Sequence, residues 1–277
     1  PGGFKDGNDI ISSTSRLSRI FHSFEKNIKN PIYNRQVFQR FNGYDASQSL
    51  ICTRIDGPSI VTSVWMNNIE AAKSRLEVSG KFYLDPYSSY IYGGSSDYTN
   101  ELIDFKENYS SRLGLSIQST SRPLSGKDAF FPQMEDDSFF WGWGADRGSL
   151  SYFRKTANTR AFFYNADFDG GFTVRDIDSR LWPILAIREG YIASAGNMSG
   201  EDSSSFLSPV PFMDALFRGS YLGEAFIYSQ PLLNSTIACF GDPLSLFTFP
   251  VPFENSQLID PIRAWKIMET CYAESIC

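Results

Sequence analysis

The sequence predicts an α/β protein with a mainly parallel β-sheet. Three observations lead to this prediction: apolar runs of strand length, apolar residues at helical spacing between them, and turn residues at their borders. Strands that alternate with helices form βαβ units, whose helices cover the faces of a parallel sheet. The 277 residues are enough for one large hydrophobic core.

The first βαβ unit is predicted to begin at Leu50–Arg54, an apolar run that suits a strand covered on both faces. Asp56-Gly57-Pro58 ends this run, and both Asp and Pro are favourable at the start of the helix that follows. The next predicted strand is Phe82–Leu84. The remaining predicted elements are helices at Tyr98–Leu113, Leu181–Glu189, Pro211–Arg218 and Leu222–Ser229, strands at Leu115–Ile117, Ala161–Tyr164, Tyr191–Ala195 and Thr236–Phe240, and a core segment at Phe139–Gly144.

We expect three regions along the chain. Residues 1–45 are predicted to be an N-terminal helical segment, residues 46–250 the α/β domain, and residues 251–277 a tail that packs on the domain or on a partner. The acidic Glu135-Asp136-Asp137 is predicted to be a solvated loop. The chain begins at Pro1 rather than Met, so we expect proteolytic processing of a longer precursor.

Charge and hydropathy argue against two classes of function. A formal net charge of −6 is unfavourable for a general nucleic-acid binder, because phosphate binding requires a basic surface. No apolar run approaches the roughly 18 residues that cross a bilayer, so we expect no transmembrane segment. The sequons at Asn108, Asn197 and Asn234 permit secretion, and we expect a location outside the cytoplasm: secreted, at the cell surface, or in an organelle or particle.

The four cysteines do not predict a metal or disulfide framework. Cys52 and Cys239 lie in apolar runs and are expected to be small buried hydrophobic residues. Cys271 and Cys277 are close enough in sequence to pair. Because no C-x-x-C spacing occurs and four cysteines are few for this length, we expect no zinc site and no cofactor.

Short motifs between Asn30 and Pro250 occur in a recognisable order. They are Asn30-Pro31-Ile32-Tyr33, Thr53–Pro58, Trp141-Gly142, Ala161–Tyr164, Ala193–Asn197, Gly223-Glu224-Ala225 and Gly241-Asp242-Pro243. Together they resemble an uncharacterised bacterial family related to gingipain-like cysteine peptidases of the caspase fold. The resemblance implies a three-layer α/β sandwich. Related chains carry further residues that supply the first strands, so it also implies that this chain lacks the N-terminal part of the fold.

The catalytic residues that the resemblance implies are absent. In those peptidases a histidine follows one central strand and a nucleophilic cysteine follows the next. Here the first position falls near Asn165 and Asp167, and the second near Asn197 and Ser199. The only histidine, His22, belongs to the predicted N-terminal helical segment. We therefore expect a degenerate site and no cysteine-peptidase activity.

The acidic segment at the end of the Ala161–Tyr164 strand has a second interpretation. Asp167 and Asp169 are weak candidates for metal ligands, because carboxylates bind Ca²⁺ and ligands favour this edge of an α/β sheet. The spacing of an EF-hand is absent, however. A solvated turn remains the simpler interpretation of this segment.

The leading hypothesis is a non-catalytic structural or assembly subunit on a peptidase-like scaffold. Two alternatives remain open: a hydrolase with an acidic or Ser-based site around Asn165–Asp169 and Asn197–Ser199, and a carbohydrate- or peptide-binding module that uses the same strand ends. An enzyme is expected to bring its polar side chains together in one pocket. Because missing strands would expose a sheet edge, we expect a protein partner or a second copy of the chain to cover it.

Overall fold

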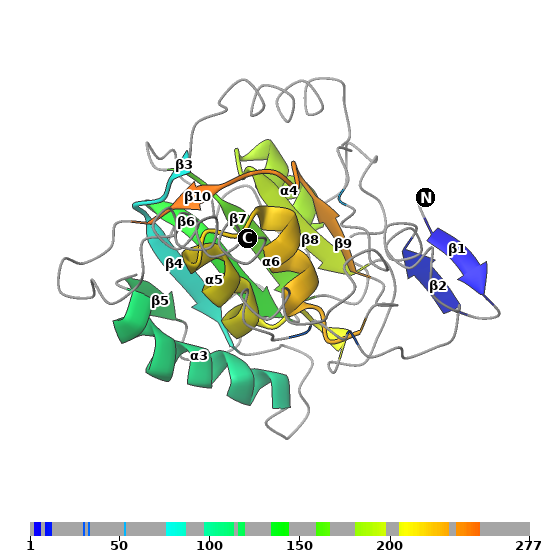
Figure 1. The fold of residues 1–277 in the computed structure, drawn as a ribbon, viewed down its shortest axis with the longest axis horizontal. Coiled ribbons are helices and arrows are strands. Elements are labelled where there is room, and N and C mark those ends of the chain that lie inside the picture. Colours follow the sequence, from blue (N-terminus) through cyan, green and yellow to red (C-terminus); the bar gives the residue numbers. More distant parts are fainter. Residues whose placement is uncertain are drawn as a thin grey trace, which may run out of the picture.

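A six-stranded sheet forms the centre of the protein (Figure 1). The computed structural model describes residues 3–6, 9–12, 30, 33, 53, 76–86, 97–113, 116–119, 134–143, 159–166, 181–197, 205–232 and 237–249. The strand order is β5-β4-β6-β7-β8-β9. These strands are β4 (Lys81–Asp85), β5 (Ile117–Ser119), β6 (Asp137–Trp143), β7 (Phe162–Ala166), β8 (Ala193–Asn197) and β9 (Ile237–Phe240).

The sheet is mainly parallel, which confirms the α/β character predicted from sequence. Strands β5, β4, β6, β7 and β8 run parallel, and β9 pairs with β8 in the antiparallel direction. The described helices are α3 (Asp97–Leu113), α4 (Trp182–Arg188), α5 (Pro209–Phe217) and α6 (Leu222–Ser229). Helix α4 ends just before Gly190, whose φ of +96° is easily adopted by glycine.

Two smaller sheets accompany the main one. Strands β3 (Leu76–Glu77) and β10 (Phe247–Thr248) pair in parallel, which places Phe247 and Phe249 against the core. Strands β1 (Gly3–Asp6) and β2 (Asp9–Ser12) form an antiparallel hairpin. The described start of the predicted N-terminal helical segment is thus extended, because its residues pair as strands.

Several predictions fall largely outside the described residues. Of the predicted strand Leu50–Arg54 only Thr53 is described; it lies in no strand, and its hydroxyl donates a hydrogen bond to the carbonyl of Gly241 over 2.7 Å. The histidine His22, the remaining cysteines Cys52, Cys271 and Cys277, and the tail at 251–277 are also outside them. Among the described helices, none is long and apolar enough to cross a membrane.

The alternation of side chains along the strands gives the main sheet two apolar faces. On the first, here called the α5 face, Phe162 of β7 packs against Phe212 of α5 with 4.4 Å between ring centroids. On the second, the α4 face, Phe140 stacks on Phe163 at 4.4 Å, and Trp182 of α4 lies over both rings. Figure 1 shows α5 and α6 in front of the sheet. Because helices cover both faces, the strands are continuous apolar runs, which is why the sequence predicted them well.

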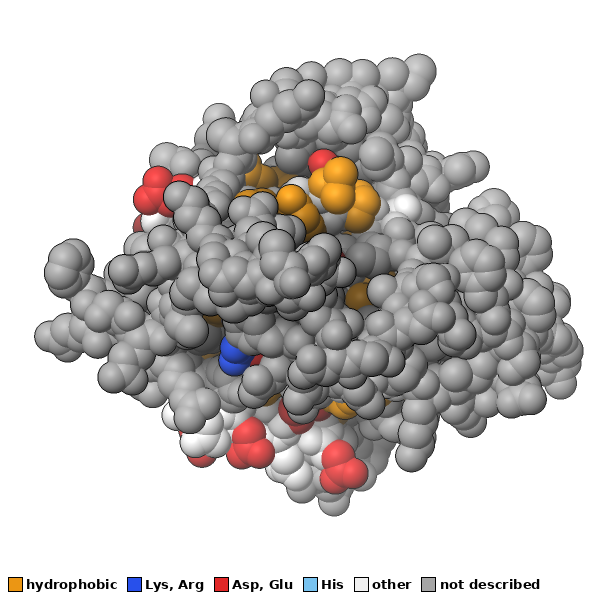
Figure 2. All heavy atoms as spheres, in the orientation of Figure 1, with side chains coloured by type: hydrophobic (Ala, Val, Ile, Leu, Met, Phe, Trp, Pro, Cys, Tyr) orange, Lys and Arg blue, Asp and Glu red, His pale blue; other side chains and the backbone are white. Residues whose placement is uncertain are grey.

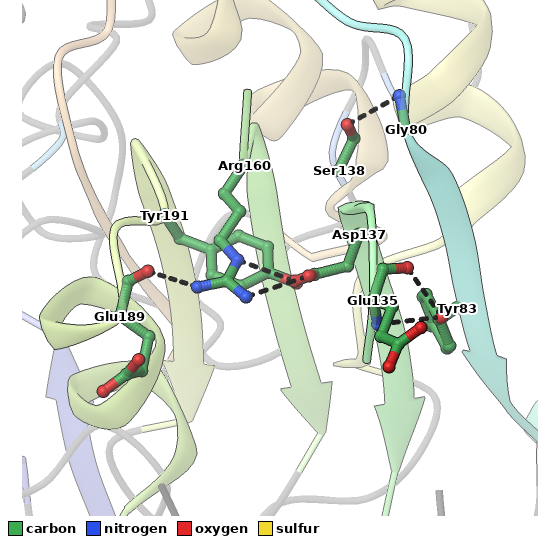
Figure 3. Close-up of polar contacts among 8 residues, drawn as sticks. All are labelled: Gly80, Tyr83, Glu135, Asp137, Ser138, Arg160, Glu189 and Tyr191. Carbon is green, nitrogen blue, oxygen red and sulfur yellow. Dashed lines mark hydrogen bonds and ion pairs between the residues drawn. The ribbon is translucent and has the colours of Figure 1, made fainter. Parts of the chain in front are cut away.

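A buried ion-pair network joins the amino ends of three strands, and Figure 3 shows its side chains. Asp137, the first residue of β6, binds Arg160 through two hydrogen bonds of 3.0 Å, from Nε and Nη2. The third guanidinium nitrogen, Nη1, donates to the carbonyl of Glu189 at 2.5 Å, and the Tyr191 hydroxyl donates to Asp137 Oδ2 at 2.5 Å. Arg160 precedes β7 and Tyr191 precedes β8, so the network ties β6, β7 and β8 together.

This network corrects the prediction of a solvated acidic loop. Glu135 and Asp136 are exposed, whereas Asp137 has no exposed surface. The difference arises because Arg160, far away in the sequence, supplies a partner for the charge. Burial and then the charge of Asp137 raise the pKa of Tyr191 well above its ordinary value, so its hydroxyl keeps the proton that it donates.

Removing one partner of this network is expected to destabilise the fold strongly. The variant Asp137→Ala leaves the guanidinium of Arg160 buried without its counter-ion, which costs about 3–5 kcal/mol. Urea unfolding followed by circular dichroism measures the loss. The matched control is Asp214→Ala, which breaks the half-exposed ion pair of 2.9 Å with Arg218 and should cost less than about 1 kcal/mol. Equal losses in the two variants would contradict a special role for the buried pair.

Candidate functional site

The carboxyl ends of the parallel strands are the candidate functional site, because ligands of open α/β sheets bind at this edge. Of the residues that the sequence placed there, Asn165 near the end of β7 and Asn197 at the end of β8 are described. Asp167, Asp169 and Ser199 lie outside the described residues. The two asparagines show how polar groups are arranged at this edge.

Asn165 belongs to a row of residues that crosses three strands. The register pairs Asp85 of β4 with Gly142 of β6, and Gly142 with Asn165 of β7. Residues paired across a parallel sheet point to the same face, so all three belong to the α4 face, as does Phe163. We call Asp85, Gly142 and Asn165 the carboxyl-end row.

Glycine in the middle of this row makes space for the amide of Asn165. A Cβ atom on Gly142 would lie 3.1 Å from Asn165 Oδ1 and 3.1 Å from the ring of Phe140. The amide therefore reaches over β6, where any other residue would press against it. These contacts agree with the predicted core segment Phe139–Gly144, which is tightly packed at Gly142.

The amide of Asn165 is buried with its hydrogen-bonding capacity unused. Its exposed fraction is 0%, and neither Oδ1 nor Nδ2 has a hydrogen-bond partner within the part of the chain that the structure describes. An unsatisfied buried polar group costs about 1–3 kcal/mol, and native structures contain few of them. Asn165 is therefore a buried amide of the carboxyl-end row in which neither polar atom is satisfied by a described residue.

Asn197 lies on the opposite face of the sheet. The register pairs Tyr164 with Ala195, and Asn197 is two residues beyond Ala195, so it points to the α5 face. There the hydroxyl of Tyr164 donates to Asn197 Oδ1 over 3.4 Å. This contact fixes the oxygen of the amide, while Nδ2 has no partner among the described residues.

Two tyrosines hold the backbone of the segment that leads into α5. The N–H of Leu207 donates to the hydroxyl of Tyr164 at 3.3 Å, and the hydroxyl of Tyr98 donates to the Leu207 carbonyl at 2.8 Å. Tyr98 also accepts a hydrogen bond of 2.9 Å from Trp141 Nε1. Burial, as the main cause, raises the pKa of Tyr98 well above its ordinary value. We call Tyr98 and Tyr164 the tyrosine clamp. The clamp was not predictable from the sequence, because the two hydroxyls bind backbone atoms of Leu207, far away along the chain.

A serine and a glutamate lie next to the clamp on the α5 side. Ser208, which precedes the first residue of α5, donates its hydroxyl hydrogen to Glu101 of α3, and its oxygen does not accept a capping hydrogen bond from the backbone N–H groups of its own helix. Burial raises the pKa of Glu101, and the hydrogen bond from Ser208 partly opposes this shift. The pair joins two helices. It has no described imidazole beside it that would activate the serine as a nucleophile.

The geometry thus separates the polar groups that the sequence placed near one site. Asn165 lies with Asp85 and Gly142 on the α4 face, and Asn197 lies with Tyr164 on the α5 face. The two asparagines look like neighbours in the sequence because both follow central strands. Their positions in the strand register differ by one residue, which turns their side chains to opposite faces and which only the pairing of the strands reveals. In the described ranges, no group of three residues with metal-binding side chains occurs.

The described cysteine does not supply a nucleophile. Cys239 lies within β9 with 0% exposure, and burial raises the pKa of its thiol far above the usual range. A thiol in such surroundings stays protonated, whereas nucleophilic attack needs the thiolate. This burial confirms the prediction that Cys239 is a small hydrophobic residue of the core.

Cys239 is expected to resist alkylation until the protein unfolds. Native protein treated with iodoacetamide near pH 8, then digested and mapped by mass spectrometry, should leave Cys239 unmodified, because the thiol is both buried and protonated. The same treatment in concentrated urea should modify it. Rapid labelling of native Cys239, or its reaction with a thiol-directed peptidyl probe, would contradict this expectation.

The tyrosine clamp is expected to contribute measurably to stability. Each of Tyr98→Phe and Tyr164→Phe leaves a buried backbone group of Leu207 without its partner and should lower the free energy of unfolding by about 1–3 kcal/mol. Denaturant unfolding measures both. Tyr221→Phe is the control, since this ring is 44% exposed, and should change stability by less than about 0.5 kcal/mol. If the free energy of unfolding falls no more than in the control, water satisfies the backbone groups of Leu207 as well as the tyrosines do.

Comparisons with known proteins give no further guide to the site. No family model matches the chain, and no curated protein matches it.

Proposed function

We propose that the protein is a non-catalytic structural or assembly subunit built on a peptidase-like scaffold, the caspase-type three-layer sandwich. The observation that carries the proposal is the arrangement of Asn165 and Asn197 at the carboxyl ends of β7 and β8. They stand near the positions where a peptidase of this type needs a base and a nucleophile, and they point to opposite faces of the sheet.

The chemistry of these groups supports binding rather than catalysis. A carboxamide neither takes up a proton at neutral pH nor attacks a carbonyl group, so it cannot replace histidine or cysteine. Cys239 is in the middle of its strand rather than after it, and its thiol is protonated. The alternative of a hydrolase requires Asp167, Asp169 or Ser199, which lie outside the described residues.

The outer strands of the sheet indicate where a partner would bind. Strand β9 is completely buried, whereas residues 116–119 along β5 are exposed or half-buried. The N–H of Phe82 donates to the carbonyl of Ser116 at 2.9 Å, so Ser116 and Gln118 face β4 and the main-chain groups of Ile117 face outward. No described strand pairs with this outer side. We place the proposed contact with a protein partner or second copy at β5, because such edges are usually covered.

Away from β5, the described residues form only a small exposed apolar surface. The large hydrophobic side chains with high exposure are Leu244 at 68% and Tyr221 at 44%, and backbone hydrogen bonds from Leu222 to Ser245 and from Gly223 to Pro243 join their two segments. On the face drawn in Figure 2, described hydrophobic side chains are visible in the upper half between residues drawn in grey, and acidic ones at the lower border and at the upper left. Acidic groups at the surface suit a protein partner better than a nucleic acid.

The proposed location of the protein follows from its sequons. Those at Asn108 and Asn234 are compatible with a compartment outside the cytoplasm, and Asn108 is exposed on α3.

The purified chain is expected to associate through β5. Size-exclusion chromatography with light scattering should give a mass above the 31.2 kDa of one chain, or reveal a bound partner. Ile117→Pro removes the N–H that faces outward while it keeps the bonds of Ser116 and Gln118 to β4, so this variant should lose the association. Gln118→Ala is the control and should retain it. A stable 31.2 kDa monomer without a partner would contradict the proposal.

A further inference from the structure

The side chain of Asn165 is a buried polar group that lowers the stability of the fold without a compensating hydrogen bond to a described residue. It has 0% exposure, it lies on the apolar α4 face beside Phe163 and Phe140, and neither amide atom has a hydrogen-bond partner among the residues that the structure describes. Leucine has nearly the same size and no polar atoms to satisfy. On packing grounds alone, leucine would be the more stable choice at this position.

The contrast with Asn197 shows that the unused capacity is particular to Asn165. The oxygen of Asn197 accepts a hydrogen bond from Tyr164, so that side chain stabilises the α5 face as well as ending β8. Asn165 makes no comparable contact. Buried polar groups that weaken the fold are typical of places where function, rather than stability, selects the residue.

The carboxyl-end row gives the amide a direction. Asn165 Oδ1 extends over β6, where Gly142 has no side chain, toward Asp85 on the next strand. Because neighbouring strands are about 4.8 Å apart, the backbones of Asp85 and Asn165 are about 10 Å from each other. Between them lies the backbone of Gly142, and the ring of Phe140 packs next to Gly142 on the side of the strand's amino end.

The chemistry of the row selects the kind of ligand. A carboxamide presents an N–H donor and a C=O acceptor side by side, which is the pattern that pairs with another amide through two hydrogen bonds. The carboxyl group of Asp85 makes the row unfavourable for an anion. A neutral peptide group, with its own N–H and C=O, satisfies both atoms of Asn165 at once.

We infer that the carboxyl-end row of Asp85, Gly142 and Asn165 binds a main-chain peptide group of a polypeptide partner, and that Asn165 is the residue that pairs with it. This inference rests on the proposed function as a protein that binds rather than cleaves. Each member of the row is buried in this structure, so binding includes opening of the row. The measured affinity is reduced by the small fraction of molecules that are open.

Nuclear magnetic resonance of the full chain tests the inference with a small probe. The side-chain NH₂ resonances of Asn165 are identified as the pair that disappears in Asn165→Leu. We expect N-methylacetamide, a model of the peptide group, to change the chemical shifts of this pair during a titration, and we expect the change to level off at high concentration. Methyl acetate, an ester of similar size without the N–H, should shift it several-fold less. The Asn197→Leu variant is the control and should keep the response, because Asn197 lies on the other face.

Thermal unfolding of the same variants supplies a second readout. Asn165→Leu should raise the melting temperature by roughly 2–4 °C, since it removes an unsatisfied buried amide. Asn197→Leu should lower it, since it leaves the hydroxyl of Tyr164 without its acceptor.

The outcomes separate this inference from the proposed function. An Asn165 resonance pair that does not respond to N-methylacetamide, equal responses to amide and ester, or a lower melting temperature for Asn165→Leu would each overturn the inference. None of these results would affect the proposal of a non-catalytic subunit. Conversely, if the wild-type chain cleaves peptides while the Asn165 pair still responds, the site stands and the proposed function fails.

Discussion

The buried ion pair between Asp137 and Arg160 is the interaction on which the arrangement of the central strands depends. All three guanidinium nitrogens of Arg160 are used, two by Asp137 and one by the carbonyl of Glu189, and Tyr191 completes the contacts of Asp137 Oδ2. These residues stand at the starts of β6, β7 and β8 or just before them. Since the carboxylate is fully buried and the Arg160 side chain is only 5% exposed, a shift of one strand relative to its neighbour would leave a buried charge unpaired.

The two ends of the sheet consequently differ in character. At the amino ends, buried polar atoms are paired in short hydrogen bonds that fix the strands. At the carboxyl ends, Asn165 and the nitrogen of Asn197 are buried without partners among the described residues. The amino ends therefore stabilise the fold. The carboxyl ends keep hydrogen-bonding capacity that a partner can use, as is usual for the functional edge of an α/β sheet.

The described aromatic side chains lie mostly in the core, on the two faces of this sheet. Rings from β6 and β7 stack on both faces, and each buried phenylalanine contributes about 1.5–3 kcal/mol through the area that it removes from water. Most of the described aromatic side chains are thus unavailable as a contact surface. A partner would instead meet the half-buried strand β5, where the main chain of Ile117 faces outward. Binding through main-chain groups and a carboxamide would suit a protein that recognises extended polypeptide.

The sequence by itself determined the elements of the fold. Helix α6 has the predicted bounds Leu222–Ser229, β4 contains its predicted run, and β7 and β9 overlap theirs, because strands covered on both faces are continuous apolar segments and turn residues mark their ends. It also determined that no histidine or cysteine follows the two central strands. These properties are local, so a pattern of neighbouring residues is enough to reveal them.

Only the tertiary structure decided what the polar residues do. Asp137 resembled the end of a solvated loop, and its burial depends on Arg160, 23 residues away. Asn165 and Asn197 looked equivalent, and the strand register placed them on opposite faces, one unused and one held by Tyr164. The physical reason is that a polar side chain takes its role from the partner that the fold brings to it. Pairing between distant strands sets that partner, and no local pattern contains it.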